Sequence, residues 1–280
     1  MVSTGHMAPL LALLLGACKP DDTDDTEGPA DTGPTDTADT APIEPPSDFE
    51  AGRYHVTAME ILDEGEGFDL TGDGEIDNKL PAVLTLLDMA VEDDMSREGM
   101  NATLAASIAA GDLVQLVDAR YAESVLVYDL LLGSMDEGGA LHLDEEQSFD
   151  AHGVPWSRLE GVFLDQVAVS LGPDDVQIPV VFYADEPALM IPVQQAVASG
   201  TLDASGTGAM LGGAIPVEEL MDQVVEPLIP EEGYGDQTKE ELLKTVEALL
   251  SNENVATIEL ADGARGIPAA LAFSAEPATW

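Results

Sequence analysis

The sequence predicts an α+β domain over residues 51–280, mainly an antiparallel sheet or sandwich with N-terminal and C-terminal helical segments. Two patterns lead to this fold class. Between residues 112 and 198, short runs of Val, Leu and Ile are separated by Gly, Asp and Pro, which is typical of antiparallel strands. On either side of that region, apolar residues recur at the spacing that places them on one face of a helix. Helices that flank a sheet, rather than alternate with its strands, define the α+β class.

The N-terminal part of the domain is predicted to hold one strand and two helices. Residues 53–62 alternate as a strand with Tyr54, Val56 and Ala58 expected on one side. The first helix is predicted over 80–91. The second is predicted over 98–110, with Gly111 as its left-handed C-cap.

The strands that follow are expected to form an open sheet or a sandwich. Pro179 and Pro192 lie inside two of the apolar runs, and a proline cannot donate a hydrogen bond to a neighbouring strand. Both runs are therefore predicted at a sheet edge or at a bulge. A barrel is not expected, because the strands that precede Trp280 are few and irregular.

The C-terminal part is predicted to hold two more helices and two closing strands. The helices cover 216–229 and 238–250. Thr238, with Glu241 three residues later, matches the capping box that begins many helices. The closing strands are expected at 255–260 and 267–275.

Composition narrows the classes of function. The chain of 280 residues has 9 basic and 55 acidic residues, and its formal net charge is −46. A surface this negative repels phosphate groups, and nucleic-acid binding needs clusters of Lys and Arg that the sequence lacks. We therefore expect no nucleic-acid partner. Such a surface attracts cations and keeps a protein soluble.

The N-terminus has the features of an export signal. An apolar run over residues 7–17 is too short to span a bilayer and ends at Leu15-Gly16-Ala17-Cys18. An apolar residue three positions before a cysteine, with small residues between them, resembles the lipobox of bacterial lipoproteins. The resemblance implies that residues 1–17 are a signal peptide and that Cys18 becomes the lipidated first residue of the mature chain.

Lipidation at Cys18 would anchor the chain to a membrane without a spanning helix. Cys18 is the one cysteine, so neither an intrachain disulfide nor a cysteine-rich zinc site can form. Lys19 stands where similar lipoproteins commonly carry an aspartate for inner-membrane retention, which favours the bacterial outer membrane over the inner one. Residues 18–50 are dominated by Asp, Thr and Pro and are predicted to be a disordered tether. A glycosylated Thr/Pro stalk is the alternative.

An acidic, glycine-rich stretch, residues 69–80, precedes the first predicted helix. With Asp69 at position 1 of a twelve-residue loop, oxygen-bearing residues fall at positions 3, 5, 7 and 9, and Gly74 falls at position 6. Ca²⁺ takes six to eight oxygen ligands, and the EF-hand loop supplies them at these positions. The predicted calcium ligands are Asp69, Thr71, Asp73, Glu75 (through its backbone carbonyl) and Asp77.

This stretch resembles EF-hand loops and, more closely, the calcium loops of thrombospondin type 3 repeats. It carries Leu80 where an EF-hand has its bidentate glutamate. The resemblance implies one bound Ca²⁺ whose shell is completed by neighbouring residues, for which the candidates are Asp63, Glu64, Glu66 and Asp88. The alternative is an acidic turn that leads into a helix without binding a metal.

Other reactive residue types form no known motif. The histidines after Cys18 lack metal-binding spacing, although His142 and Asp144 share one face of a predicted strand. The glycine-rich segment 206–213 lacks the spacing of a phosphate-binding loop and is interpreted as a turn packed against the sheet. Ser205 does not lie in a nucleophile elbow.

The resulting hypothesis is a non-enzymatic lipoprotein of the bacterial envelope, whose calcium-stabilised domain has a binding or structural role. One alternative is a periplasmic carrier in which the apolar runs of 124–198 line a cleft for an apolar ligand. A large apolar cavity would favour this carrier, and a filled core would exclude it. The other alternative is a hydrolase, which would need a Ser/His/Asp or His/carboxylate cluster in one pocket.

Overall fold

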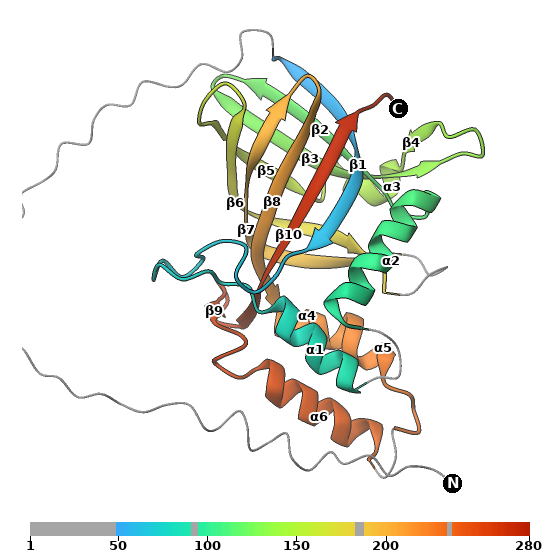
Figure 1. Cartoon of the computed structure of the whole chain (residues 1–280), viewed down its shortest axis with the longest axis vertical. Coiled ribbons are helices and arrows are strands. Elements are labelled where there is room, and N and C mark those ends of the chain that lie inside the picture. Colours follow the sequence, from blue (N-terminus) through green and yellow to red (C-terminus); the bar gives the residue numbers. More distant parts are fainter. Residues whose placement is uncertain (1–48, 91–94, 183–187, 234–236) are drawn as a thin grey trace, which may run out of the picture. The chain divides into compact units, whose positions relative to one another are not determined.

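A computed structural model describes residues 49–90, 95–182, 188–233 and 237–280. The predictions of a signal peptide, a lipidated Cys18 and a tether up to residue 48 lie outside the described residues. Within the described part, one antiparallel sheet closes on itself, and most of the helices gather near one of its ends (Figure 1). No helix among these residues is both long enough and apolar enough to cross a membrane.

The sheet is a closed barrel, not the α+β sheet or sandwich that the sequence predicts. Eight strands follow one another around the barrel in the order β1-β2-β3-β5-β6-β7-β8-β10. The first and the last of them pair with each other, from Tyr54 opposite Pro277 to Ile61 opposite Leu271. The fold-class prediction was wrong because pairing between the two ends of a chain leaves no trace in local periodicity. Closure also removes the free sheet edges that an open sheet would expose.

The described strands have the following bounds in chain order: β1 (Ala51–Ile61), β2 (Val114–Ala122), β3 (Val125–Met135), β4 (Leu141–Leu143), β5 (Arg158–Phe163), β6 (Ala168–Val180), β7 (Leu189–Asp203), β8 (Gly206–Pro216), β9 (Ile258–Glu259) and β10 (Arg265–Pro277). The short strand β4 pairs with β3 outside the circle, and β9 pairs with β10.

The helices of the described part are α1 (Leu80–Ala90), α2 (Arg97–Ala110), α3 (Glu145–Ser148), α4 (Val217–Leu220), the π-helical segment η2 (Met221–Val225), α5 (Glu226–Leu228) and α6 (Lys239–Leu250). The predicted helices are confirmed in place. Gly111 caps α2 with a left-handed φ of 80°. The capping box of Thr238 and Glu241 begins α6, as predicted.

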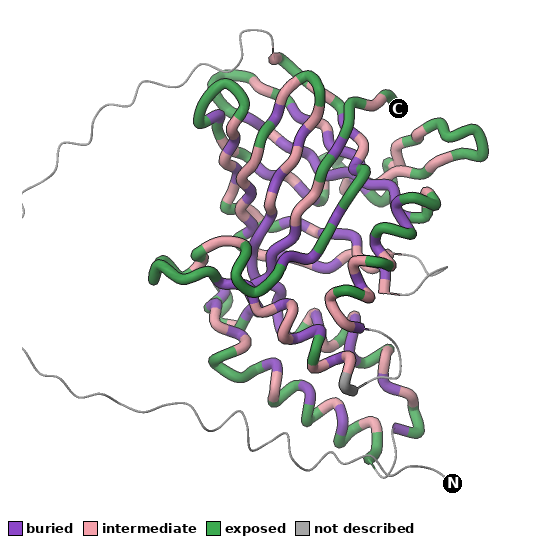
Figure 2. Tube along the Cα trace, viewed as in Figure 1, coloured by how far each residue is buried: buried purple, intermediate pink, exposed green. Residues whose placement is uncertain are grey.

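Buried residues alternate with more exposed ones along many of the strands (Figure 2), as expected when successive side chains point to opposite faces of a sheet. In β1, Tyr54 and Val56 are buried, and a bulge between Val56 and Ala58 then shifts the alternation by one residue. Met59 and Ile61 are therefore buried, and Ala58 is exposed. The prediction that Ala58 shares a side with Tyr54 was wrong for this reason.

One end of the barrel, called here the aromatic end, is closed by packed rings. Phe163, the last residue of β5, makes edge contacts with Phe49 and Tyr121 at ring-centroid distances of 5.8 and 5.4 Å. Edge-to-face contacts at these distances are favourable for aromatic pairs. Phe49 lies two residues before the start of β1, so the chain enters the barrel at this end.

The opposite end, called here the helical end, is crossed by the hairpin of β6 and β7. In the described residues, 176–180 of β6 pair with β7 alone, and 189–193 of β7 pair with β6 alone. Pro179 and Pro192 lie in these segments, each of which has a strand on one side only. The N–H group that a proline lacks is therefore not needed by a carbonyl group of a second neighbouring strand. The prediction that both prolines lie at a sheet edge is confirmed.

Candidate functional site

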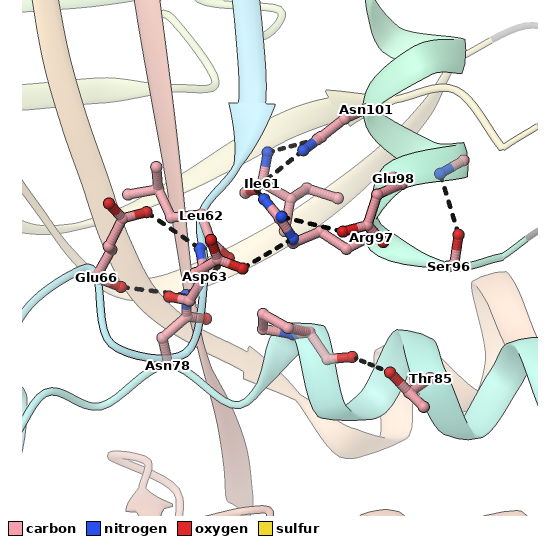
Figure 3. Close-up of polar contacts among 12 residues, drawn as sticks. Ile61, Leu62, Asp63, Glu66, Asn78, Thr85, Ser96, Arg97, Glu98 and Asn101 are labelled. Carbon is pink, nitrogen blue, oxygen red and sulfur yellow. Dashed lines mark hydrogen bonds and ion pairs between the residues drawn. The ribbon is translucent and has the colours of Figure 1, made fainter.

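Hydrogen bonds hold the helices against the helical end of the barrel (Figure 3). The side chain of Asn101 in α2 accepts from the N–H of Ile61 at 2.7 Å and donates to its carbonyl at 3.1 Å. Arg97 also donates to the Ile61 carbonyl and pairs with the carboxylate of Asp63 at 3.1 Å. Just before α1, the N–H of Lys79 donates to the carbonyl of Pro268 at 2.8 Å. These bonds fix α1 and α2 over the mouth of the barrel.

A cavity of about 40 Å³ lies between this mouth and the helices. Every side chain that lines it is apolar. The barrel strands and the helices both contribute to the lining, which includes Ile61, Ile178, Ile191 and Leu271 from strands and Leu84 and Leu220 from α1 and α4. Because no polar side chain is present, this cavity can hold only an apolar group without a loss of hydrogen bonds.

A second cavity of about 20 Å³ lies inside the barrel. Ile178 and Leu271 line both cavities, so the two adjoin across these side chains. The smaller cavity has one polar side chain in its lining, that of Gln115 in β2. Gln115 is only 6% exposed, and the hydrogen bonds of the described residues include none from its side chain. The fully enclosed polar side-chain atoms without a partner among these residues are His55 Nε2, Asn78 Oδ1 and Thr257 Oγ1, and the amide of Gln115 is not one of them. No charged residue lines either cavity, so an ion entering them would lose its hydration without compensation.

The predicted calcium loop joins β1 to α1 along the outer face of the barrel. Its Phe68 lies on Gly212 of β8, because a Cβ atom on that glycine would come within 2.5 Å of the Phe68 ring. The segment 206–213 is therefore a strand that makes room for Phe68, and its prediction as a turn was wrong. Leu70 packs on the outer cluster of Ala214, Ile258 and Leu260.

The carboxylate of Asp69 accepts hydrogen bonds from backbone N–H groups of the loop itself. One of its oxygens accepts from the N–H groups of Gly72 and Asp73, at 2.6 and 3.1 Å, and the other accepts from Gly74 at 2.8 Å. Asp73 in turn accepts from the N–H of Glu75 at 2.9 Å. Bonds of this kind hold acidic turns without a metal.

The carboxylate of Asp77 closes the loop from its other side. Its Oδ2 accepts from the N–H of Leu70 at 2.8 Å and from both the N–H and the hydroxyl of Thr71. The fold thus brings the predicted ligands into one loop. Across the described ranges, however, no group of three or more His, Cys, Asp or Glu side chains is arranged to hold a metal ion. Calcium binding by this loop stays a prediction.

Three of the acidic residues proposed to complete a calcium shell are engaged elsewhere. Asp63 pairs with Arg97, and the carboxylate of Glu66 accepts from the N–H of Asp63 at 3.3 Å. Asp88 in α1 accepts from the N–H of Met95 at 2.9 Å, which ties α1 to the start of α2. These carboxylates hold the helical cover in place.

The residues considered for catalysis are engaged in turns. Nε2 of His142 lies 3.4 Å from a carboxylate oxygen of Asp136, and Asp144 caps α3. The hydroxyl of Ser205 donates to Asp203 at 2.5 Å, and no histidine takes part in the described hydrogen bonds of either residue. Accepting from Ser205 lowers the pKa of the Asp203 carboxyl. The arrangement is that of a capped β-turn between β7 and β8.

A row of charges crosses the outer face of the barrel and was not anticipated from the sequence. Asp129 in β3 is only 3% exposed and pairs with Arg158 at 2.7 Å and with Arg120. Burial raises the pKa of the neighbouring Asp118, against the opposing effects of Arg120 and Arg53. Since Asp129 is paired on both sides, the row joins β2, β3 and β5 and leaves no unpaired buried charge there.

Comparison of the chain with family models, with curated proteins and with solved structures gave no match in any of the three. The site is therefore defined by its own geometry: a closed antiparallel barrel, a helical cover, an apolar cavity between them, and a smaller adjoining cavity inside the barrel.

Proposed function

We propose that this chain is a non-enzymatic carrier of a small apolar ligand, anchored to a membrane of the bacterial envelope through Cys18. The closed barrel is a fold compatible with a ligand carrier. The observation that carries the proposal is the 40 Å³ cavity between the barrel mouth and α1, α2 and α4, whose lining is entirely apolar. Pockets for small molecules are lined predominantly by apolar side chains and often lie at the mouths of barrels.

An unfilled cavity costs stability, so its presence in a core supports a binding role. Protein interiors are normally packed to the density of organic crystals. At the cost found for engineered cavities, a void of 40 Å³ destabilises the fold by about 1 kcal/mol. A bound apolar group would recover the contacts that the lining side chains lack.

The cavity volumes limit the shape of the ligand. The two cavities of 40 and 20 Å³ are far smaller than the large cleft expected for the carrier hypothesis. Both are also far smaller than the engineered cavity of about 150 Å³ that binds benzene. A thin aliphatic chain along both therefore requires the lining side chains to move apart, and a fused ring system is excluded in this conformation. The rest of the barrel interior is a packed core.

Binding can be tested with n-hexane as the probe and the purified full-length chain. Methyl NMR would follow the signals of Ile178 and Leu271, which line both cavities. We expect both signals to shift with hexane in the parent chain, and the Ile178 signal to stop responding in Leu271→Phe, whose larger side chain fills the space. Val162→Phe, on an exposed position of β5, is the matched control and should bind as the parent does. Unshifted methyl signals at saturating hexane would rule the carrier out.

The membrane part of the proposal rests on the lipobox at Leu15–Cys18. We expect Cys18→Ser to abolish incorporation of labelled fatty acid and to release the chain from the membrane fraction of expressing bacteria. Fractionation of inner and outer membranes would test the preference for the outer membrane. Retention of Cys18→Ser in the membrane fraction would contradict lipid anchoring.

A further inference from the structure

We infer that Gln115 binds a neutral polar group at one end of the ligand, which makes the ligand an uncharged aliphatic molecule with a single hydrogen-bonding head. This inference rests on the proposed carrier function and names the ligand class of the same site. Alcohols, amides and esters belong to this class, and free fatty-acid anions do not.

The position of Gln115 in β2 directs its side chain inward. It pairs with Leu132 of β3, two residues before the pair of Val117 and Leu130, which belong to the main core. Because side chains alternate along a strand, Gln115 and Val117 share the interior face. Gln115 also lines the smaller cavity directly.

The Gln115 amide differs from the hydroxyl groups inside the same barrel. Tyr54 donates to the carbonyl of Asp203, and Tyr128 bonds to Thr207, each at 3.0 Å. Gln115 is as deeply buried as a core residue, and the hydrogen bonds of the described residues include none from its side chain, which lines the smaller cavity. An unpaired buried amide is unfavourable, and native proteins satisfy the large majority of such groups. A ligand atom in the adjoining cavity would satisfy it.

The order of the cavities sets the orientation of the ligand. The larger cavity lies under the helices, and the smaller one, with Gln115, lies inside the barrel beyond Ile178 and Leu271. The polar head therefore enters first, and the aliphatic chain extends toward α1 and α4. Since no charged side chain lines either cavity, a carboxylate or ammonium head would be buried without a partner.

A matched six-carbon series tests this assignment: n-hexane, 1-hexanol and hexanoate, titrated into the full-length chain. Gln115→Leu should weaken 1-hexanol by about fivefold, the usual net effect of one hydrogen bond, and leave hexane binding unchanged or tighter. Hexanoate should not bind either protein. Gln115→Met, which keeps the length of the side chain, should behave as Gln115→Leu does. Gln166→Leu makes the same exchange at an exposed turn position and should leave all affinities unchanged.

The outcomes separate the two proposals. In one outcome the parent chain binds hexane, and Gln115→Leu changes the affinities for 1-hexanol and hexane equally or not at all. This result would support the carrier function and overturn the role of Gln115. Hexanoate bound as tightly as 1-hexanol would overturn the neutral ligand class. A parent chain that binds neither hexane nor 1-hexanol would overturn the proposed function and this inference together.

Discussion

The two ends of the barrel are closed by different kinds of packing. At the aromatic end, Phe163 packs edge-on against two other rings, and the hydroxyl groups of Tyr54 and Tyr128 are hydrogen-bonded. At the helical end, strands and helices from distant parts of the chain meet and leave an apolar cavity, with the amide of Gln115 beyond it. The first end is built as a core, and the second is the end at which we propose that a ligand binds.

This difference explains why the cavity lies at the helical end of a barrel that is otherwise filled. The interior is closed by side chains from the strands at one end only. The other end is closed by α1, α2 and α4, which are fixed by a small number of hydrogen bonds such as those of Asn101 and Lys79. The larger of the two interior cavities therefore lies where a separate layer of structure covers the barrel.

The largest expected effect comes from opening the aromatic end. Leu126 in β3 is fully buried there, and Leu126→Ala should lower the free energy of unfolding by about 3 kcal/mol through lost contacts and a new cavity. Urea unfolding of the full-length chain measures this. A loss below about 1 kcal/mol would mean that the aromatic end is no better packed than the helical end.

Alkaline pH should also weaken the aromatic end. Burial raises the pKa of Tyr54 to about 12, from 10.0, so the unfolded chain loses this proton first as pH rises. The protonated Tyr54 therefore contributes fully to the free energy of unfolding below pH 10. This contribution falls by about 1.4 kcal/mol per pH unit between pH 10 and about 12. Tyr54→Phe should make the unfolding free energy less dependent on pH in this window. Identical slopes for the two proteins would contradict the buried, neutral Tyr54.

A pair of enlargements contrasts the two ends directly. Leu126→Phe should cost about 2 kcal/mol because the packed end has no room, whereas Leu271→Phe should cost less than about 1 kcal/mol because it fills the cavity. The difference between the two unfolding free energies is the quantity to measure. Equal costs would show that the cavity walls cannot accommodate added atoms.

The smallest expected effect concerns the acidic loop on the outer face. If Ca²⁺ binds there as the sequence predicts, Ca²⁺ at about ten times its Kd should raise stability by about 1.4 kcal/mol over EDTA. Asp73→Asn is the sharpest variant, because the amide oxygen can still accept from Glu75 while one ligand charge is removed. Thermal unfolding with and without millimolar Ca²⁺ measures the effect. Equal unfolding temperatures in Ca²⁺ and EDTA would reduce the loop to an acidic turn.

Local features were readable from the sequence, and long-range ones were not. The capping box at Thr238 and the left-handed Gly111 follow from residues a few positions apart. The closure of β1 on β10 and the packing of Phe68 on Gly212 join segments far apart in the chain, so no local pattern indicates them. The bulge after Val56 also reversed an alternation that seemed regular in the sequence.

The candidate site was only partly predictable for the same reason. The acidic loop was located correctly, but the use of Asp69 and Asp77 by backbone N–H groups depends on how the loop folds. Gln115 carried a usable signal, a polar residue in the apolar run Leu113–Val117 on the same side as Val117. Its meaning depends on a cavity formed by strands and helices together.

The most direct test of the central claim is the location of xenon in crystals of the full-length chain under pressure, because xenon enters dry apolar cavities. The account predicts xenon at the helical end, in contact with Ile178 and Leu271, and none among the rings of the aromatic end. An empty helical end, or xenon bound among Phe49, Tyr121 and Phe163, would contradict it.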